Sequence, residues 1–111
     1  MAFLLINHYL CTILTLKENI MIRLNCFFQA KAGKYNEALN AAIALVAESQ
    51  KQEGCIAYDV FESGTRKNIF MICETWANQE TLDAHSASAP FVELVPLITA
   101  CGEMKIEKFE F

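Results

Sequence analysis

The chain has 111 residues, of which 54% are apolar and 20% are charged, and its formal net charge is −4. This length fits one domain, and a domain this small has difficulty burying so much apolar surface, so we expect a partner subunit. The nine Lys and Arg residues are scattered and form no basic stripe, so we predict no nucleic-acid partner.

The cysteines are odd in number, form no Cys-x-x-Cys pair and mostly lie within apolar runs. They are Cys11, Cys26, Cys55, Cys73 and Cys101. Such cysteines are typical of reduced, buried thiols, so we expect a cytoplasmic protein. Two histidines and dispersed cysteines offer no ligand pairs at metal spacing, so the sequence predicts no metal site.

Residues 1–20 differ in composition from the remainder and end just before a second methionine, Met21. No Lys or Arg precedes Lys17 and no small-residue cleavage site appears, which disfavours a signal peptide. The apolar run is also too short to span a membrane. Two interpretations stay open: translation from Met21, or a genuine docking extension. Any role of His8 depends on this choice.

From Met21 onward the hydrophobic period changes in an orderly way. Residues 21–29 and 55–62 show the alternation of strands, and residues 34–52 carry apolar positions at helical spacing, with Gly54 predicted to end that helix. Residues 63–67 contain Gly64 and predict a hairpin connection. The third strand, residues 68–76, has an apolar centre on both faces, so we predict an interior strand covered on both sides.

The last third of the chain predicts two helical pieces and a strand. Asn78 can cap a helix whose inward face carries Leu82, His85 and Ser86. Pro90 suits the start of a second piece, which Pro96 is expected to kink or interrupt.

The final strand, residues 103–111, changes its apolar side. Met104 and Ile106 share one face, whereas Phe109 and Phe111 share the other. This predicts either a β-bulge or a strand that continues along the sheet of a neighbouring subunit.

The resulting order, βαββαβ, predicts an α+β, ferredoxin-like fold with a four-stranded antiparallel sheet. The helices would cover one face of the sheet. The other face would expose Phe and Ile side chains, so we expect a homodimer formed through the sheet faces and the C-terminal strand.

Residues 21–111 resemble the antibiotic biosynthesis monooxygenase family of dimeric α+β barrel proteins, which includes quinol monooxygenases. The resemblance rests on an ordered set of motifs: Glu53-Gly54-Cys55, Tyr58-Asp59-Val60, Glu74-Thr75-Trp76, Leu82-x-x-His85 and Ala89-Pro90-Phe91. It implies a cofactor-independent monooxygenase that oxidises a quinol-like or polyphenolic molecule with oxygen, without flavin or metal.

His85 is the candidate base, because its ordinary pKa near ~6.5 allows proton exchange at neutral pH. Trp76 and Phe91 are expected at the pocket wall, and Tyr58 and Asn25 could bond a substrate oxygen. Glu74 is placed in the pocket too, although a strand carboxylate of this kind is more often structural. It could pair with Arg23 or Lys105, or with backbone groups. An inward histidine is likewise often a satisfied core residue, and a single tryptophan often only packs.

Other functions stay open. One is an isomerase of a small phosphorylated carbonyl compound, for which Arg23, Arg66 and Lys67 would be the phosphate ligands. Another is a dimeric binding or stress-response domain without turnover. Haem degradation is a weaker fourth, based on Asn25, Trp76 and His85.

Overall fold

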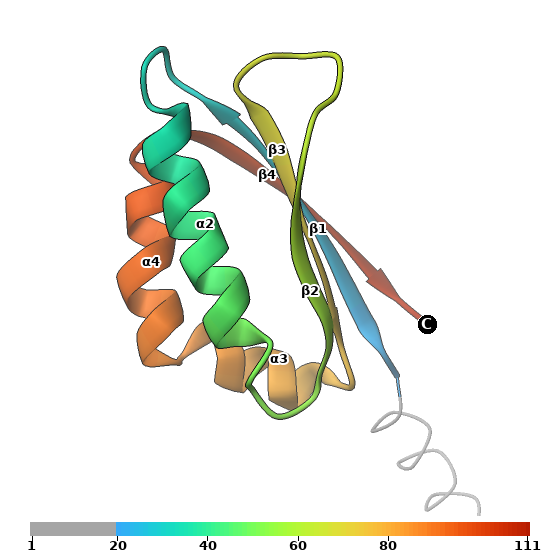
Figure 1. The fold of residues 1–111 in the computed structure, drawn as a ribbon. Coiled ribbons are helices and arrows are strands. Elements are labelled where there is room, and N and C mark those ends of the chain that lie inside the picture. The colour runs from blue at the N-terminus through green and yellow to red at the C-terminus, as the bar shows by residue number, and fades with distance from the viewer. Residues whose placement is uncertain (1–19) are drawn as a thin grey trace, which may run out of the picture.

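One antiparallel sheet carries three helices on one of its faces in the part of the chain that the structure describes (Figure 1). The structure is a computed structural model that describes residues 20–111. The elements, in chain order, are β1 (Ile22–Ala30), α2 (Tyr35–Ser49), β2 (Cys55–Glu62), β3 (Ile69–Trp76), α3 (Gln79–Ser86), α4 (Ala89–Thr99) and β4 (Gly102–Glu110). The predicted extension and His8 lie outside the described residues, apart from Ile20.

The strand order is β2-β3-β1-β4, and every neighbouring pair is antiparallel. This confirms the predicted α+β, ferredoxin-like arrangement with β3 in the interior of the sheet. The fold brings β1 and β3 together at its centre, although more than forty residues separate paired positions such as Cys26 and Ile72.

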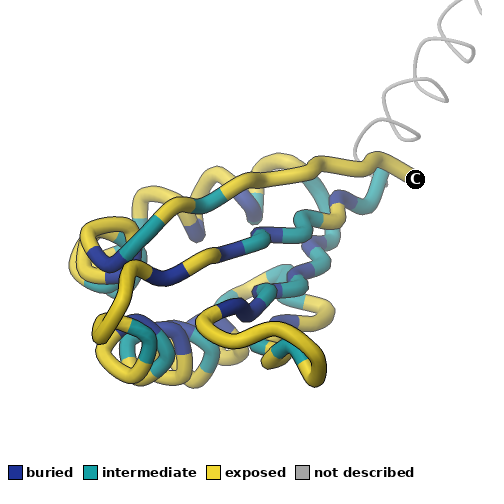
Figure 2. The backbone as a smooth tube through the Cα atoms, turned by 90° about the horizontal axis from the view of Figure 1, so that it is seen from above, coloured by how far each residue is buried: buried dark blue, intermediate teal, exposed yellow. Residues whose placement is uncertain are grey.

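The alternation along each strand determines which side chains face the helices. On β1, Ile22, Cys26 and Phe28 are buried toward the helix layer, whereas Arg23 and Gln29 are exposed on the opposite face. Figure 2 shows this burial concentrated between the sheet and the helices. The core is tightly packed, as in the stack of Phe28 on Phe70, with ring centroids 4.8 Å apart.

The first helix ends earlier than predicted. α2 stops at Ser49, and Gly54 belongs to the turn that leads into β2. Its φ of +79° favours glycine, and a Cβ at this position would overlap the Thr81 side chain on α3. Gly54 therefore allows this turn to approach α3 closely.

Proline does not interrupt the second helical piece. α4 continues past Pro96 to Thr99, contrary to one of the two predicted outcomes. Both Pro96 and Val92, the residue four positions earlier whose carbonyl loses its partner, are exposed. Water can therefore bond this carbonyl, and the helix persists.

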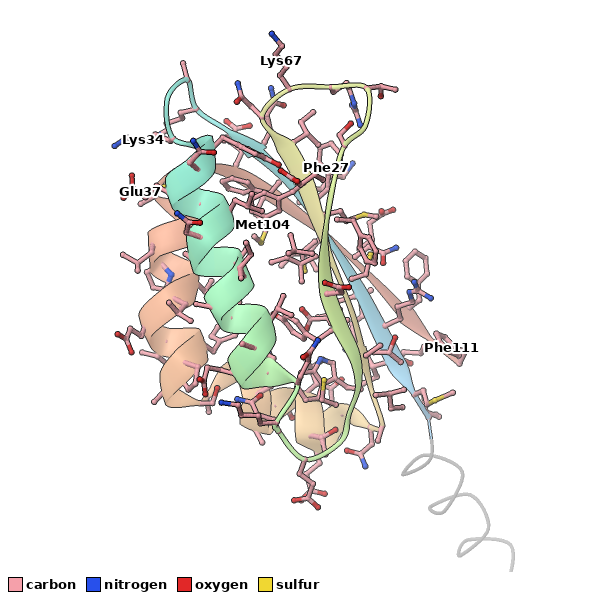
Figure 3. All side chains as sticks on the ribbon, viewed as in Figure 1. Phe27, Lys34, Glu37, Lys67, Met104 and Phe111 are labelled. Carbon is pink, nitrogen blue, oxygen red and sulfur yellow. The ribbon has the colours of Figure 1, made fainter. Side chains whose placement is uncertain are left out.

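Of the two explanations predicted for the last strand, the β-bulge is wrong. Every residue of β4 from Gly102 to Glu110 has a partner on β1 without a register shift. The change of apolar side is therefore real: Met104 projects toward the helices, whereas Phe111, just after the strand, points away from them (Figure 3). The one shift in the ladders of this sheet lies in β2, between Cys55 and Ala57.

The face of the sheet without helices is only partly covered. Met71 and Cys73 on β3 are half-buried there, so the chain alone does not cover both faces of this strand. None of the helices between residues 20 and 111 is both long and apolar enough to span a membrane.

Candidate active site

An apolar cavity of about 150 Å³ lies between the sheet and the helices, and His85 is part of its wall. All three helices and all four strands contribute residues to it. The lining residues are Leu24, Cys26, Leu45, Tyr58, Ile72, Glu74, Leu82, His85, Ser86, Phe91, Val95, Ile98, Met104 and Ile106.

His85 is positioned by the inward face of α3. Asn78 begins this helix by accepting a hydrogen bond from the Thr81 N–H, as the sequence predicts. His85 is 2% exposed, and its Nδ1 lies 2.7 Å from Gln52 Oε1. Its Nε2 has no hydrogen-bond partner among residues 20–111 and lies 4.0 Å from Glu74 Oε1.

Burial lowers the pKa of His85 to about 4. The imidazole is therefore neutral at neutral pH, and one of its two ring nitrogens carries no hydrogen. A buried acceptor nitrogen without a partner is costly in a purely structural histidine. A neutral ring in this state can accept a hydrogen bond from a bound molecule, and a nearby negative charge would be needed to stabilise the imidazolium if the proton is transferred.

Glu74 enters the cavity from β3. The Trp76 indole Nε1 donates to its Oε1 at 3.0 Å, and the Cys26 thiol lies 3.9 Å from its Oε2. Burial raises the pKa of Glu74, and hydrogen bonds from Trp76, Tyr58 and Cys26 oppose this rise.

The predicted pairing of Glu74 with a cation is wrong. Glu74 lies opposite Leu24 on β1 and Tyr58 on β2, so its side chain shares their face of the sheet. Arg23 neighbours Leu24 along β1, and Lys105 lies opposite Phe27, so both alternate to the other face. The two cations therefore lie on the opposite face of the sheet, and Glu74 is held by neutral donors instead.

Aromatic rings enclose the imidazole on three sides. The centroid of the Trp76 ring lies 4.6 Å from that of the imidazole, at an interplanar angle of 31°. The Tyr58 and Phe91 rings approach the imidazole edge-on, with centroid distances of 5.4 and 5.2 Å. Trp76 is fully buried and lies behind His85 and Glu74 without lining the cavity. It supports the site from behind, whereas the sequence predicted it in the pocket wall.

The structure brings together four of the six predicted site residues at the cavity wall: His85, Glu74, Tyr58 and Phe91. Asn25 is not among them. It pairs with Cys73 and Glu107 on the face of the sheet that carries no helix, and its Oδ1 is buried without a partner among the described residues.

Sequence reasoning missed Gln52, Ser88 and Cys26. Gln52 lies in the turn after α2, separated from His85 by 33 residues, and no motif connects the two. Ser88 lies just before Pro90 at the start of α4. A serine followed closely by a proline indicates where a helix begins, but it does not indicate that the serine contacts His85. Cys26 was predicted as a buried thiol only.

Within residues 20–111, no group of three or more His, Cys, Asp or Glu side chains lies close enough to hold a metal ion. The profile of the antibiotic biosynthesis monooxygenase family matches residues 21–96, most of the chain. The chain belongs to this family.

Members and structural relatives of the family cover most of the described domain. A Bacillus subtilis (strain 168) protein named "Putative monooxygenase YcnE" is 34% identical over 71 residues, or 64% of this chain and 75% of that protein. A solved structure from Bacteroides thetaiotaomicron VPI-5482, described as a conserved protein of unknown function and "possible oxidoreductase", is 54% identical. The TM-score is 0.82, and the match covers 84% of this chain and 99% of the chain in the solved structure.

A third relative is a crystal structure named antibiotic biosynthesis monooxygenase. It is 26% identical to this chain, with a TM-score of 0.72, and the match covers 81% of this chain and 95% of the chain in that structure. The two solved structures share the overall fold of this chain.

Proposed function

We propose that the protein is a monooxygenase that oxidises a small, single-ring quinol with molecular oxygen and needs no flavin or metal for the step. The overall reaction is quinol plus oxygen to hydroxyquinone plus water. One oxygen atom enters the ring and the other leaves as water. The family and the names of its relatives support the monooxygenase reaction type.

The observation that carries the proposal is that His85, whose buried Nε2 has no hydrogen-bond partner among residues 20–111, is one of the residues that line an apolar cavity. Nε2 and Glu74 Oε1 are 4.0 Å apart and both can accept a hydrogen bond. A substrate hydroxyl supplies the missing donor. His85 would then remove the hydroxyl proton, and the nearby Glu74 carboxylate would stabilise the imidazolium that forms.

The size and walls of the cavity support a single aromatic ring. Its volume is about 150 Å³, similar to a dry protein cavity that accommodates benzene. Aliphatic and aromatic side chains form most of the wall, so the ring would bind by apolar contact while the hydroxyl reaches His85.

The chemistry needs little beyond a base and a dry site. Oxygen in its triplet ground state reacts slowly with closed-shell molecules, but a phenolate can transfer one electron to it. The resulting radical pair combines at a ring carbon to form a peroxide anion, which becomes a hydroperoxide by taking back the proton held by His85. Loss of water from this hydroperoxide leaves the new carbonyl group. Exclusion of bulk water strengthens the interactions that stabilise the charged species.

The geometry gives less support to an isomerase of phosphorylated compounds. None of the residues that line the cavity is Lys or Arg. Arg66 and Lys67 lie in the β2–β3 hairpin loop, at the opposite end of the molecule from α3 (Figures 1 and 3). Lys108 bonds the exposed Gln79 and does not enter the cavity. Haem degradation loses its basis as well, because Asn25 lies on the other face of the sheet from Trp76 and His85.

Oxygen consumption tests the proposal. The purified full chain is incubated with single-ring and two-ring quinols, with a protein-free blank for autoxidation, and labelled oxygen is traced into the product. We expect turnover of single-ring quinols, with kcat/KM about 10²- to 10⁴-fold lower in His85→Gln. Asp83→Asn, on the exposed side of the same helix, is the matched control.

Two results would overturn the proposal. The first is oxygen uptake by the wild type that never exceeds the blank, which would favour a binding domain without turnover. The second is equal turnover by wild type and His85→Gln, which would remove His85 as the base.

We further propose that the chain forms a homodimer through the face of the sheet that carries no helix and through its C-terminal strand. Phe61 and Phe109 on that face are 53% and 46% exposed, and Phe111 is 58% exposed. Large apolar side chains exposed together on one face of a sheet are typical of an interface. A second copy would cover them.

We also propose a cytoplasmic location. Cys26, Cys55, Cys73 and Cys101 are free thiols. Burial raises the pKa of Cys26 to about 12, so this thiol is protonated and unreactive at neutral pH. Free, buried thiols fit a reducing compartment.

A further inference from the structure

The imidazole of His85 is tied to its own backbone by two side chains. Ser88 Oγ donates to the His85 carbonyl oxygen at 2.6 Å. Gln52 Nε2 donates to Ser88 Oγ at 3.1 Å, and Gln52 Oε1 lies 2.7 Å from His85 Nδ1. These contacts form a closed loop that begins at the carbonyl of His85 and ends at its ring.

The direction of every hydrogen bond in this loop follows from its first member. A carbonyl can only accept, so the Ser88 hydroxyl must use its single hydrogen there. Ser88 can then only accept from Gln52, which turns the amide nitrogen of Gln52 toward Ser88 and its oxygen toward the imidazole. An amide oxygen also only accepts, so Nδ1 must carry the hydrogen. In the neutral ring, Nε2 then has none.

Ser88 gives up its usual structural role to make this contact. It is the N-cap residue of α4, with φ −71° and ψ 154°, yet its side chain makes no capping hydrogen bond. A serine at this position normally bonds a backbone N–H of the first helical turn. Its hydroxyl is directed to His85 and Gln52 instead, which indicates that the loop has a purpose other than starting the helix.

We propose that Gln52 and Ser88 are positioning residues that hold His85 as the Nδ1–H tautomer, so that the unprotonated Nε2 faces the substrate cavity. The catalytic value of this arrangement rests on the proposed function, but the tautomer itself does not. A histidine side chain free in water favours the opposite, Nε2–H tautomer, which could not accept the substrate proton at Nε2. The loop therefore selects the form that can act as a base.

Gln52 and Ser88 act from outside the cavity. Both line a second cleft of about 370 Å³ next to α3 and are absent from the cavity wall, whereas His85 lies between the two and lines both. The titratable groups around the ring are Glu74 and Tyr58 on the cavity side, and Glu53 and Glu80 in the outer cleft. Substitution of Gln52 or Ser88 should therefore change His85 while leaving the substrate contacts in place.

Nuclear magnetic resonance tests the tautomer without any substrate. Long-range proton–nitrogen correlations of the imidazole rings in the ¹⁵N-labelled full chain at neutral pH distinguish a nitrogen that bears hydrogen from one that does not. His85→Gln identifies which signals belong to His8. We expect Nδ1–H for His85 in the wild type and a shift toward Nε2–H in both Gln52→Leu and Ser88→Ala.

Thr99→Val is the matched control, because the Thr99 hydroxyl also bonds the carbonyl three residues earlier, that of Pro96, but contacts nothing near His85. It should leave the tautomer unchanged. A wild type with Nε2–H, or variants of both Gln52 and Ser88 that keep Nδ1–H, would overturn the inference.

Kinetics provide a second measurement. With a quinol that is turned over, we expect Gln52→Leu and Ser88→Ala to lower kcat by about tenfold or more with little change in KM. Gln52→Glu places a carboxylate at Nδ1 and should raise the pH at which the activity falls on the acid side. If no quinol is turned over, the tautomer result still stands or fails by itself.

Discussion

Burial of His85 makes the stability of the protein depend on pH. Its pKa is about 4 in the native state, against an ordinary value of ~6.5 when unfolded. As the pH falls from ~6.5 to about 4, the unfolded state binds the proton first, so the free energy of unfolding decreases. The loss attributable to His85 is at most about 3 kcal/mol. The raised pKa of Glu74 acts in the opposite direction.

Urea unfolding at pH 7 and pH ~4.5 measures this linkage. We expect the wild type to lose stability toward acid more steeply than His85→Gln, because the variant has no imidazole to protonate at this site. Asp83→Asn serves as a control with a native histidine. Parallel loss in the wild type and His85→Gln would show that the His85 pKa is close to its ordinary value.

At the scale of an element, the turn between α2 and β2 depends on Gly54. Both Gly33 and Gly54 have positive φ, +78° and +79°, but a Cβ at Gly33 would meet nothing within 4 Å, whereas one at Gly54 would overlap the Thr81 side chain on α3. Gly33→Ala should therefore cost only the left-handed backbone penalty, about 1–2 kcal/mol. Gly54→Ala should cost more and displace α3, the helix that carries His85.

Chemical denaturation of the two variants separates the backbone penalty from the steric one. We expect Gly54→Ala to be less stable than Gly33→Ala by about 1–3 kcal/mol, by the usual cost of overpacking. Thr81→Ser in the Gly54→Ala background should recover part of the difference, since it removes the methyl group nearest the new Cβ. Equal stability of the two alanine variants would mean that Thr81 moves aside freely.

For the whole molecule, the proposed dimer interface predicts the effect of surface charge. Phe61 is 53% exposed on the sheet face and Ile43 is 52% exposed on α2, so they match in exposure but not in location. Phe61→Glu should weaken dimerisation by at least about tenfold, because a carboxylate would be buried without a partner. Ile43→Glu should have no effect.

Light scattering coupled to size-exclusion chromatography over a dilution series measures this difference. A wild type that is monomeric at all concentrations would contradict the interface. So would a dimer that Phe61→Glu leaves intact while Ile43→Glu disrupts it.

Much of the fold follows from local patterns in the sequence. Alternation along residues 21–29 already separates Cys26 from Arg23 and Asn25, and the period of α3 already turns His85 inward. The side on which Glu74 lies follows only from the register of β3 against β1. The predictions that failed concern ends and irregularities, such as the end of α2 and the bulge in β4. These depend on exposure and on neighbouring strands, which a local period does not contain.

The sequence by itself determined the order of elements, the family resemblance and the inward direction of His85, because each depends on residues close together in the chain. Only the tertiary structure decided which sheet face holds the site, which excluded Asn25 and brought Glu74 toward the imidazole. It also placed Gln52 and Ser88 against His85 in a contact that spans 33 residues. Such contacts arise from the packing of α3 against the turn after α2, and no periodicity within either segment encodes that packing.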